Sequence, residues 1–383
     1  MPPNPESPHR EHPLPVTGSP PAAVHWLADA AALAAAAAQW RRCAVLGVDT
    51  EFFRERTYYP RLGLIQLSDG ESVWLIDAPA IEDWTPLTEV IFAAGMIKVM
   101  HAAREDLEVL RLTLGTVPLP LFDTQIAAAL CGHPPSLSYG ALVETVLGIR
   151  LAKAHARSDW LHRPLPPALI EYAALDVLYL PALWRHLEAG LQALDRRTWL
   201  DDEMQTLASE AGTADLLNAH FRRLPGLAEA GPEAQAIAFS LCQWRDRTAR
   251  RLDLPRSFVL RDEGLMALAS AAPRTLAEIE ALPVLHRKQA QRYGRQWLEC
   301  IAGAAAGSAP DIHRPDSEFR RRTRDWQKRV KEKAAALNLH PTVLLSRRDI
   351  ERLLLNGPES LPGGRGGWRH RLLAGDLAAL GND

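Results

Sequence analysis

The chain has 383 residues, enough for two or three domains at the usual size of about 100–200 residues. Hydrophobic residues make up 47% and charged residues 23%, which argues against global disorder, collagen and a membrane bundle. The formal net charge is −2, but residues 1–200 hold 16 Lys and Arg against 22 acids, whereas residues 201–383 hold 28 against 24. An acidic first half suits a metal site, and a basic second half suits a polyanion.

The first 20 residues are rich in proline, and we expect them to form a disordered tail. This segment lacks the basic start and the apolar run of a secretory signal. The longest apolar stretch, Ala28–Ala38, is too short to span a bilayer. The 4 cysteines include no Cys-x-x-Cys pair, which excludes zinc-ribbon and thioredoxin-type sites. We therefore expect a cytoplasmic protein without membrane association.

Short apolar runs, which predict strands, precede and alternate with segments of helical periodicity in the first 200 residues. The predicted strands are Cys43–Val48, Leu62–Leu67, Val73–Asp77 and Ile97–Met100. The predicted helices are Ala22–Trp40, Ala102–Leu114, Thr124–Leu130, Ser138–Val146 and Pro167–Ala189. Asp69-Gly70 is a hairpin signal between the second and third strands, so the sheet should contain an antiparallel pair. This order predicts an α/β domain with a mixed sheet.

Beyond about residue 200 every periodic segment is helical, so we expect this half to be all-α. A faint repeat relates the segment from Trp244 to Asp262 to the segment from Trp326 to Asp349, which indicates two similar helical modules. Residues 243–297 carry 11 Arg and Lys against 6 acids, a surplus that favours contact with phosphates. The aromatic residues that either stack on bases or fill the helical cores are Trp244, Tyr293, Trp297 and Trp326.

Acidic residues recur at three places in the first half. Asp49 and Glu51 follow a predicted buried strand two residues apart, so both side chains emerge on one face, which is unfavourable without a cation. Asp106 lies one turn into a predicted helix that begins soon after His101. Tyr172 and Asp176 lie four residues apart on an apolar helix and therefore share one of its faces. Each pattern is common by itself, and only their combination is informative.

This combination resembles the ribonuclease D family of the DEDD exonuclease superfamily, in the subgroup whose third motif is Tyr-x-x-x-Asp. The matching motifs are Asp49-Thr50-Glu51-Phe52 with its continuation Thr57–Leu67, His101 to Asp106, and Tyr172 to Asp176 preceded by Ser158–Leu161 and Arg163–Leu165. The basic repeats resemble the helicase-and-RNase-D C-terminal (HRDC) domain. The first copy spans roughly Glu233–Ile301, and the second, more degenerate copy spans roughly Glu318–Leu380.

The resemblance implies a ribonuclease-H-like exonuclease domain followed by two small helical domains. It implies a metal-dependent 3′→5′ exoribonuclease that releases nucleoside 5′-monophosphates from the 3′ ends of stable RNAs such as tRNA precursors. No obligate protein partner is implied. The expected divisions are a tail at 1–20, the exonuclease domain at 21–210, the first HRDC domain with a connecting helix at 211–306, and the second HRDC-like domain at 307–383.

Four convergent carboxylates without a Cys or His ligand pair form an all-oxygen donor set, which favours two Mg²⁺ or Mn²⁺ ions over zinc. These carboxylates are Asp49, Glu51, Asp106 and Asp176. Tyr172, with an ordinary pKa of about 10, is a poor base at neutral pH, so we expect it to orient the attacking water. Phe52 and His101 are candidate substrate-binding residues, Phe52 by stacking on a terminal base. The alternatives are core packing for Phe52 and a structural hydrogen bond for His101.

Two other functions compete with the exoribonuclease. A 3′→5′ DNA exonuclease would use the same carboxylates, because the distinction depends on recognition of the 2′-OH, which the sequence does not reveal. A catalytically silent RNA-binding scaffold would need only the basic half. Retention of all four carboxylates and of Tyr172 argues against the scaffold.

Overall fold

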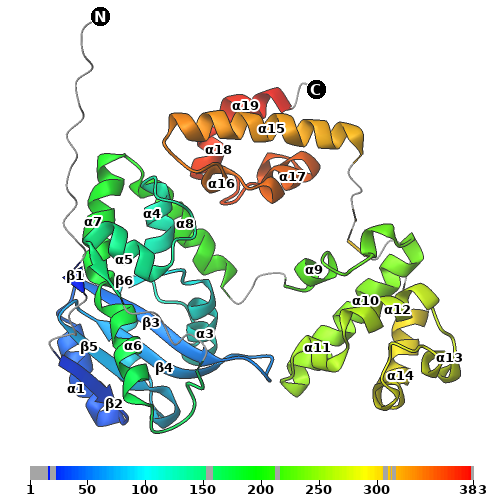
Figure 1. Ribbon diagram of the computed structural model, residues 1–383, viewed down its shortest axis with the longest axis horizontal. Coiled ribbons are helices and arrows are strands. Elements are labelled where there is room, and N and C mark those ends of the chain that lie inside the picture. Colours follow the sequence, from blue (N-terminus) through cyan, green and yellow to red (C-terminus); the bar gives the residue numbers. More distant parts are fainter. Residues whose placement is uncertain are drawn as a thin grey trace, which may run out of the picture. The chain divides into compact units, whose positions relative to one another are not determined.

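The computed structural model describes residues 16–17, 23–151, 158–211, 216–304, 309–310, 312 and 316–380 (Figure 1). These residues form two compact units. The first unit combines the described parts of Met1–Glu51, Leu62–Gly212 and Arg322–Asp383. The second unit combines Phe52–Arg61 with the described parts of Thr213–Arg321. The last helical segment of the chain therefore belongs to the same unit as the predicted α/β domain.

The first unit is built on a six-stranded mixed sheet in the order β2-β5-β4-β3-β6-β7. Its strands are β2 (Ala23–Leu27), β3 (Val45–Phe53), β4 (Arg61–Ser68), β5 (Ser72–Asp77), β6 (Ile97–Met100) and β7 (Leu121–Asp123). The β4–β5 pair is antiparallel, and the β2–β5, β3–β6 and β6–β7 pairs are parallel. A separate parallel pair joins β1 (Val16–Thr17) and β8 (Ile149–Arg150). The predicted mixed sheet is confirmed.

The hairpin between β4 and β5 shows how local sequence fixes the register. Asp69 Oδ1 accepts hydrogen bonds from the backbone N–H groups of Glu71 and Ser72 at 2.9 and 2.8 Å. Gly70 has φ +100°, a conformation that residues with a side chain rarely adopt. The turn pairs Ser68 with Val73, and the antiparallel hairpin predicted from Asp-Gly is confirmed.

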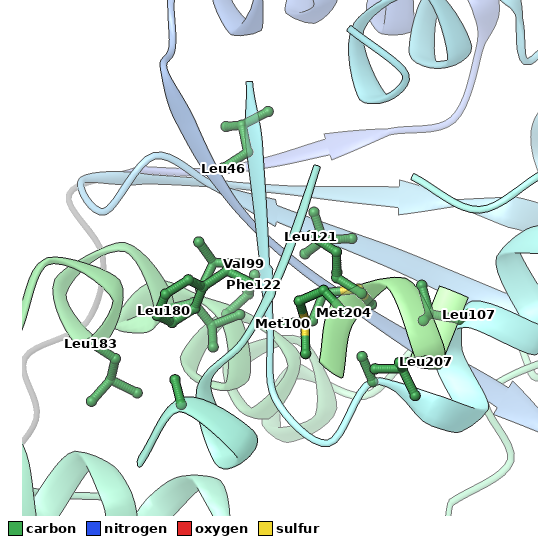
Figure 2. Close-up of a cluster of buried hydrophobic side chains, with 14 of the residues drawn as sticks. Leu46, Val99, Met100, Leu107, Leu121, Phe122, Leu180, Leu183, Met204 and Leu207 are labelled. Carbon is green, nitrogen blue, oxygen red and sulfur yellow. The ribbon is translucent and has the colours of Figure 1, made fainter. Parts of the chain in front are cut away.

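The first unit also contains α-helices, which come from both the N-terminal and the C-terminal parts of the chain. They are α1 (Ala30–Trp40), α2 (Thr85–Ile91), α3 (Arg104–Leu114), α4 (Thr124–Leu130), α5 (Tyr139–Leu147), α6 (Pro167–Leu178), α7 (Leu180–Ala193), α8 (Arg197–Glu210), α15 (Ser317–Ala336), α16 (Pro341–Leu344), α17 (Arg347–Asn356), α18 (Trp368–Leu372) and α19 (Ala374–Leu380). Figure 2 shows part of the core, where side chains of β6 and β7 lie among those of α7 and α8. The residues there include Val99, Met100, Phe122, Leu180 and Met204, all of them buried.

Three details of the first unit differ from the sequence prediction. The predicted helix from Ala22 is wrong at its start, because Ala23–Leu27 pairs with β5 as a strand and the helix begins only at Ala30, after the N-cap Asp29. The predicted strand ending at Val48 continues to Phe53, so Asp49 and Glu51 lie within β3. The single helix predicted over Pro167–Ala189 is interrupted at Tyr179 between α6 and α7. Strand pairing and tertiary contacts override local propensity at these places.

Outside Phe52–Arg61, all regular secondary structure in the described part of the second unit is helical. Its helices are α9 (Leu216–Phe221), α10 (Pro232–Leu252), α11 (Arg256–Val259), α12 (Asp262–Ala271), α13 (Leu276–Glu280) and α14 (Arg287–Ala302). Trp244 of α10 contacts Tyr293 and Trp297 of α14 edge-on, with ring centroids 5.3 and 5.9 Å apart. These aromatic rings, together with Trp326 of the first unit, are buried, so core packing outweighs base stacking for all four.

The segment Phe52–Arg61 is anchored within the second unit by Tyr58. The backbone N–H groups of Tyr58 and Tyr59 donate to Asp253 Oδ1 at 2.9 and 3.0 Å. The Tyr58 hydroxyl hydrogen-bonds with Asp246 and with Arg256, whose guanidinium also lies 4.7 Å from the Tyr58 ring centroid. No helix among the described residues is both long enough and apolar enough to cross a membrane.

Of the predicted tail, only Val16–Thr17 are described, as the strand β1, and the remainder of residues 1–20 lies outside the described part of the chain. The boundary expected between residues 306 and 307 also lies outside it. The last helical segment shares the core of the first unit. Trp368 stacks on Trp199 of α8 at 4.4 Å between centroids, and its Nε1–H donates to Glu203 at 2.7 Å.

Candidate active site

Three carboxylates converge at the middle of the first unit's sheet. Asp49 and Glu51 lie on the same face of β3, and Asp176 lies in the last turns of α6. One carboxylate oxygen from each of these residues lies within 4.8 Å of the corresponding oxygens of the other two. Residues more than 120 positions apart in the chain thus form one acidic cluster. Face-sharing within β3 and within α6 is as predicted, and the tertiary fold brings the two faces together.

A cavity of about 480 Å³ opens over this cluster. It is lined by Asp49, Thr50, Glu51, His101, Ser138, Tyr139, Gly140, Leu151, Tyr172, Asp176 and Leu180. The lining combines the three acids with apolar and hydroxyl-bearing side chains. Such a concave site with a few convergent charged groups is the usual form of an active site.

Asp106 interacts electrostatically with Asp49 and Glu51 from outside this cluster. It is buried in the first turn of α3, and its Oδ1 accepts a hydrogen bond of 2.5 Å from the Thr50 hydroxyl, between Asp49 and Glu51 in sequence. Burial raises the pKa of Asp106 to about 6, although the Thr50 hydrogen bond lowers it. Among the described residues, Asp106 is outside both the three-acid cluster and the set that lines the cavity. The structure therefore places this fourth carboxylate against the β3 backbone segment that carries the first two.

The carboxylates have pKa values raised by burial and by one another. The pKa of Asp49 is well above its usual value because of burial and then the charges of Asp106, Asp176 and Glu51. Burial, then Asp176 and Asp106, raises the pKa of Glu51 to about 8. Burial raises the pKa of Asp176 to about 6, opposed by a hydrogen bond from Tyr172. Full ionisation at neutral pH therefore requires a compensating cation.

Tyr172 projects into the cavity from the same helix as Asp176, and its hydroxyl donates a hydrogen bond to that carboxylate. Burial and the Asp176 charge raise the pKa of Tyr172 above its ordinary value, so the phenol stays protonated. The ring lies 6.0 Å from that of Trp160 between centroids. Arg163 anchors the Trp160 segment through an ion pair with Asp77 and hydrogen bonds to the Gly63 and Trp160 carbonyls.

Tyr139 is a site residue that no sequence pattern indicated. Its hydroxyl donates to the carbonyl of Leu175 at 3.0 Å and accepts from the N–H of Tyr179 at 3.1 Å. In an uninterrupted helix that N–H and that carbonyl would bond to each other. The Tyr139 hydroxyl therefore bridges the break between α6 and α7, next to Asp176.

The two predicted substrate-binding residues occupy different places. His101 lines the cavity, and its ring nitrogens already have partners, with Nδ1 2.9 Å from Thr124 Oγ1 and Nε2 3.0 Å from the Leu137 carbonyl. Burial lowers the pKa of His101, which favours the neutral ring. Phe52 follows Glu51 on β3, is half-buried, and is outside the described set of cavity-lining residues. Substrate contact by either residue stays a prediction.

The donor set of the cluster suits a hard divalent cation. Every candidate ligand is a carboxylate oxygen, and the nearest imidazole, His101, has both nitrogens engaged. Carboxylates with raised pKa values regain their charge when such a cation binds. These residues therefore fit Mg²⁺ or Mn²⁺ better than zinc.

A mixed sheet with an acidic cluster spanning a central strand and a helix defines a DEDD-type exonuclease domain. A family model described as 3′-5′ exonuclease matches residues 24–192, and a model of the HRDC domain matches residues 234–301. Ribonuclease D of Pseudomonas paraeruginosa is 36% identical over 359 residues, covering 90% of this chain and 94% of that protein. Ribonuclease D of Escherichia coli is 35% identical over 368 residues, covering 91% and 96%.

The solved structures agree with these relatives. The crystal structure of Escherichia coli RNase D, described as an exoribonuclease involved in structured RNA processing, superposes with a TM-score of 0.84 at 32% identity and covers 93% of this chain and 98% of that one. The chain belongs to the ribonuclease D family and is a 3′→5′ exoribonuclease.

Proposed function

We propose that this exoribonuclease trims the 3′ ends of structured RNAs, tRNA precursors among them, with two divalent cations held by Asp49, Glu51, Asp106 and Asp176. The observation that carries the proposal is the convergence of Asp49, Glu51 and Asp176 at the cavity. The description of the Escherichia coli relative supports structured RNA as the substrate class. We propose release of nucleoside 5′-monophosphates and a cytoplasmic location.

The residues of the site have separable tasks in this proposal. Asp49, Glu51 and Asp176 hold cations directly, and Asp106, which accepts a hydrogen bond from Thr50, holds a cation through a water molecule. Bound divalent cations supply Lewis-acid activation of water and neutralise charge on the leaving 3′ oxygen. Tyr172 keeps its proton, so its hydroxyl orients a water molecule by hydrogen bonding and does not remove a proton from it. Tyr139 holds the helix break that positions Asp176.

The decisive experiment compares matched 3′-labelled RNA and DNA oligonucleotides with Mg²⁺, Mn²⁺ or EDTA, followed by product sizing. We expect labelled mononucleotide from RNA in either cation and none in EDTA. A precursor tRNA with a 3′ extension should shorten to a discrete product near its mature end. Equal or faster digestion of DNA, or activity that persists in EDTA, contradicts the proposal.

A pair of variants on α3 tests the acidic site against general effects of charge. Asp106→Asn removes a proposed ligand, whereas Glu105→Gln removes a charge from the adjacent, exposed position. We expect loss of turnover in the first variant and nearly unchanged turnover in the second. Equal activity of the two variants would remove Asp106 from the site.

A further inference from the structure

The second unit contains a cavity whose lining is dominated by arginine. It encloses about 490 Å³ and is lined by His220, Arg223, Arg245, Arg256, Ser257, Arg261, Asp262 and Glu263. Four guanidinium groups thus face two carboxylates. Because guanidinium groups stay charged at all physiological pH values, the lining carries a permanent positive surplus.

Arg245 forms the fixed wall of this cavity. It projects from α10, is only 3% exposed, and donates through Nη1 to Asp262 Oδ1 at 2.6 Å and to the Leu260 carbonyl at 3.0 Å. Its Nε is buried and has no hydrogen-bond partner among the described residues. A buried guanidinium donor without an acceptor is unfavourable, and the fixed charge of Arg245 adds to the positive potential of the cavity wall.

The remaining arginines differ in how far they are already engaged. Arg256 forms an ion pair with Asp246 and hydrogen-bonds to the Tyr58 hydroxyl. Arg223 and Arg261 are exposed, and their side chains form no ion pair or hydrogen bond within the described part of the chain. Two guanidinium groups are therefore available for a ligand at the mouth of a cavity that a third, buried arginine closes.

Two further observations point to an anion. Burial, followed by the charges of Arg256, Arg245 and Arg223, lowers the pKa of His220, so the cavity opposes additional positive charge. Ser257 contributes an exposed hydroxyl to the same lining. Arginine guanidinium groups and hydroxyl groups are the usual side-chain donors to phosphate oxygens.

We propose that this cavity binds a phosphate group of an RNA backbone, with Arg223 and Arg261 making direct contacts. The inference rests on the proposed function in one respect, because RNA as the ligand follows from the proposed substrate class. It goes beyond that function by assigning a phosphate site in the second unit. The site would retain an RNA chain independently of cleavage.

The test is a salt titration of equilibrium binding to a tRNA-sized transcript, with Ca²⁺ replacing Mg²⁺ to suppress cleavage. The full-length protein is compared with Arg223→Gln/Arg261→Gln. The matched control, Arg247→Gln/Arg295→Gln, removes two exposed arginines of the same unit that lie outside the cavity lining. Each phosphate contact contributes about 0.7–0.9 to the slope of log affinity against log salt, so two lost contacts lower the slope by about 1.4–1.8.

Between 50 and 200 mM salt, that slope difference means that the wild type loses roughly tenfold more affinity than the cavity variant. The control should keep the wild-type slope to within about 0.5, and Arg223→Lys/Arg261→Lys, which preserves both charges, should largely restore it. Equal slopes in the cavity variant and the control, whether both unchanged or both reduced, overturn the proposal. Displacement of the RNA by a nucleoside 5′-monophosphate in the wild type but not in the glutamine variant would reassign the cavity to a free nucleotide and also overturn it.

The failure of this inference can be separated from a failure of the proposed function. The binding measurement does not depend on turnover, whereas shortening of a 3′-labelled oligonucleotide by the wild-type protein tests the proposed function alone. Thermal unfolding of each variant verifies that binding is compared between folded proteins. Neither Arg223 nor Arg261 is buried, so both glutamine substitutions should leave the unit folded.

Discussion

The two charged cavities of this protein are nearly equal in volume, at about 480 and 490 Å³, and opposite in charge. In the first unit the charges are acids whose pKa values rise because of burial and then because of one another's charges, so the site needs cations to be fully ionised. In the second unit arginines predominate and stay charged without help. The acidic cavity therefore suits cation-dependent chemistry, and the basic cavity suits the binding of a polyanion.

The largest expected effect on activity comes from removing a carboxylate from the acidic cavity. We expect Asp49→Asn or Asp176→Asn to lower turnover by about 10³-fold or more, because Lewis-acid stabilisation amounts to several kcal/mol. The metal-free variants should unfold at or above the wild-type temperature, since one mutually repelling charge is gone. Single-turnover kinetics and thermal melting in EDTA measure the two effects. Inactivity that arises only because the variants unfold would contradict the assignment.

The raised pKa values of the acidic cavity should also make the stability of the metal-free protein depend on pH. The pKa of Glu51 is about 8 in the folded protein against 4.5 ordinarily, so the folded state binds more protons between these pH values. The contribution of Glu51 to the stability of the metal-free protein is therefore fully present below about pH 4.5 and is lost as the pH rises toward 8, by up to about 4–5 kcal/mol.

The measurement is chemical or thermal unfolding in EDTA from pH 5 to 8. Glu51→Gln should flatten the profile, and added Mg²⁺ should stabilise the protein most at the upper end. If the metal-free wild type gained stability from pH 5 to 8 relative to Glu51→Gln, burial and the neighbouring carboxylates would not raise the pKa of Glu51, and the prediction would be wrong.

Tyr172→Phe removes the phenol hydroxyl from the acidic cavity and leaves every charge there in place. We expect turnover to fall by about 10²-fold with little change in RNA affinity, because orientation of water matters chiefly in the transition state. The rate at saturating RNA and the dissociation constant in Ca²⁺ separate the two quantities. An unchanged rate at saturation would rule out the orienting role.

The smallest expected effect concerns Tyr139. Tyr139→Phe removes the hydroxyl that bridges Leu175 and Tyr179, and we expect a loss of about 1–2 kcal/mol in stability. Displacement of Asp176 should raise the Mg²⁺ concentration required for half-maximal turnover and lower the maximal rate by about tenfold. Tyr59→Phe, at an exposed position in the second unit, is the matched control. A stability loss without a shift in the Mg²⁺ requirement would leave Tyr139 a structural residue only.

Much of the acidic site could be predicted from the sequence because it depends on local periodicity. Asp49 and Glu51 share a face of any extended strand, and Tyr172 and Asp176 share a face of any helix, whatever surrounds them. The β4–β5 hairpin was predictable for the same reason, since Asp69 and Gly70 specify their turn by their own chemistry. The mixed sheet followed from the order of the four predicted strands together with the family resemblance, whereas β2 and β7 were not predicted.

Only the tertiary structure decided how separate segments meet. Ala23–Leu27 carries no strand signal and becomes a strand through pairing with β5, and Tyr139 reaches the α6–α7 break from another helix. The two repeated helical segments resemble each other in sequence, yet Trp244 packs in the core of the second unit whereas Trp326 packs in that of the first. The sequence by itself determined which side chains share one face of an element. Which faces came together depended on burial and hydrogen bonding between residues far apart in the chain, and no local pattern records those interactions.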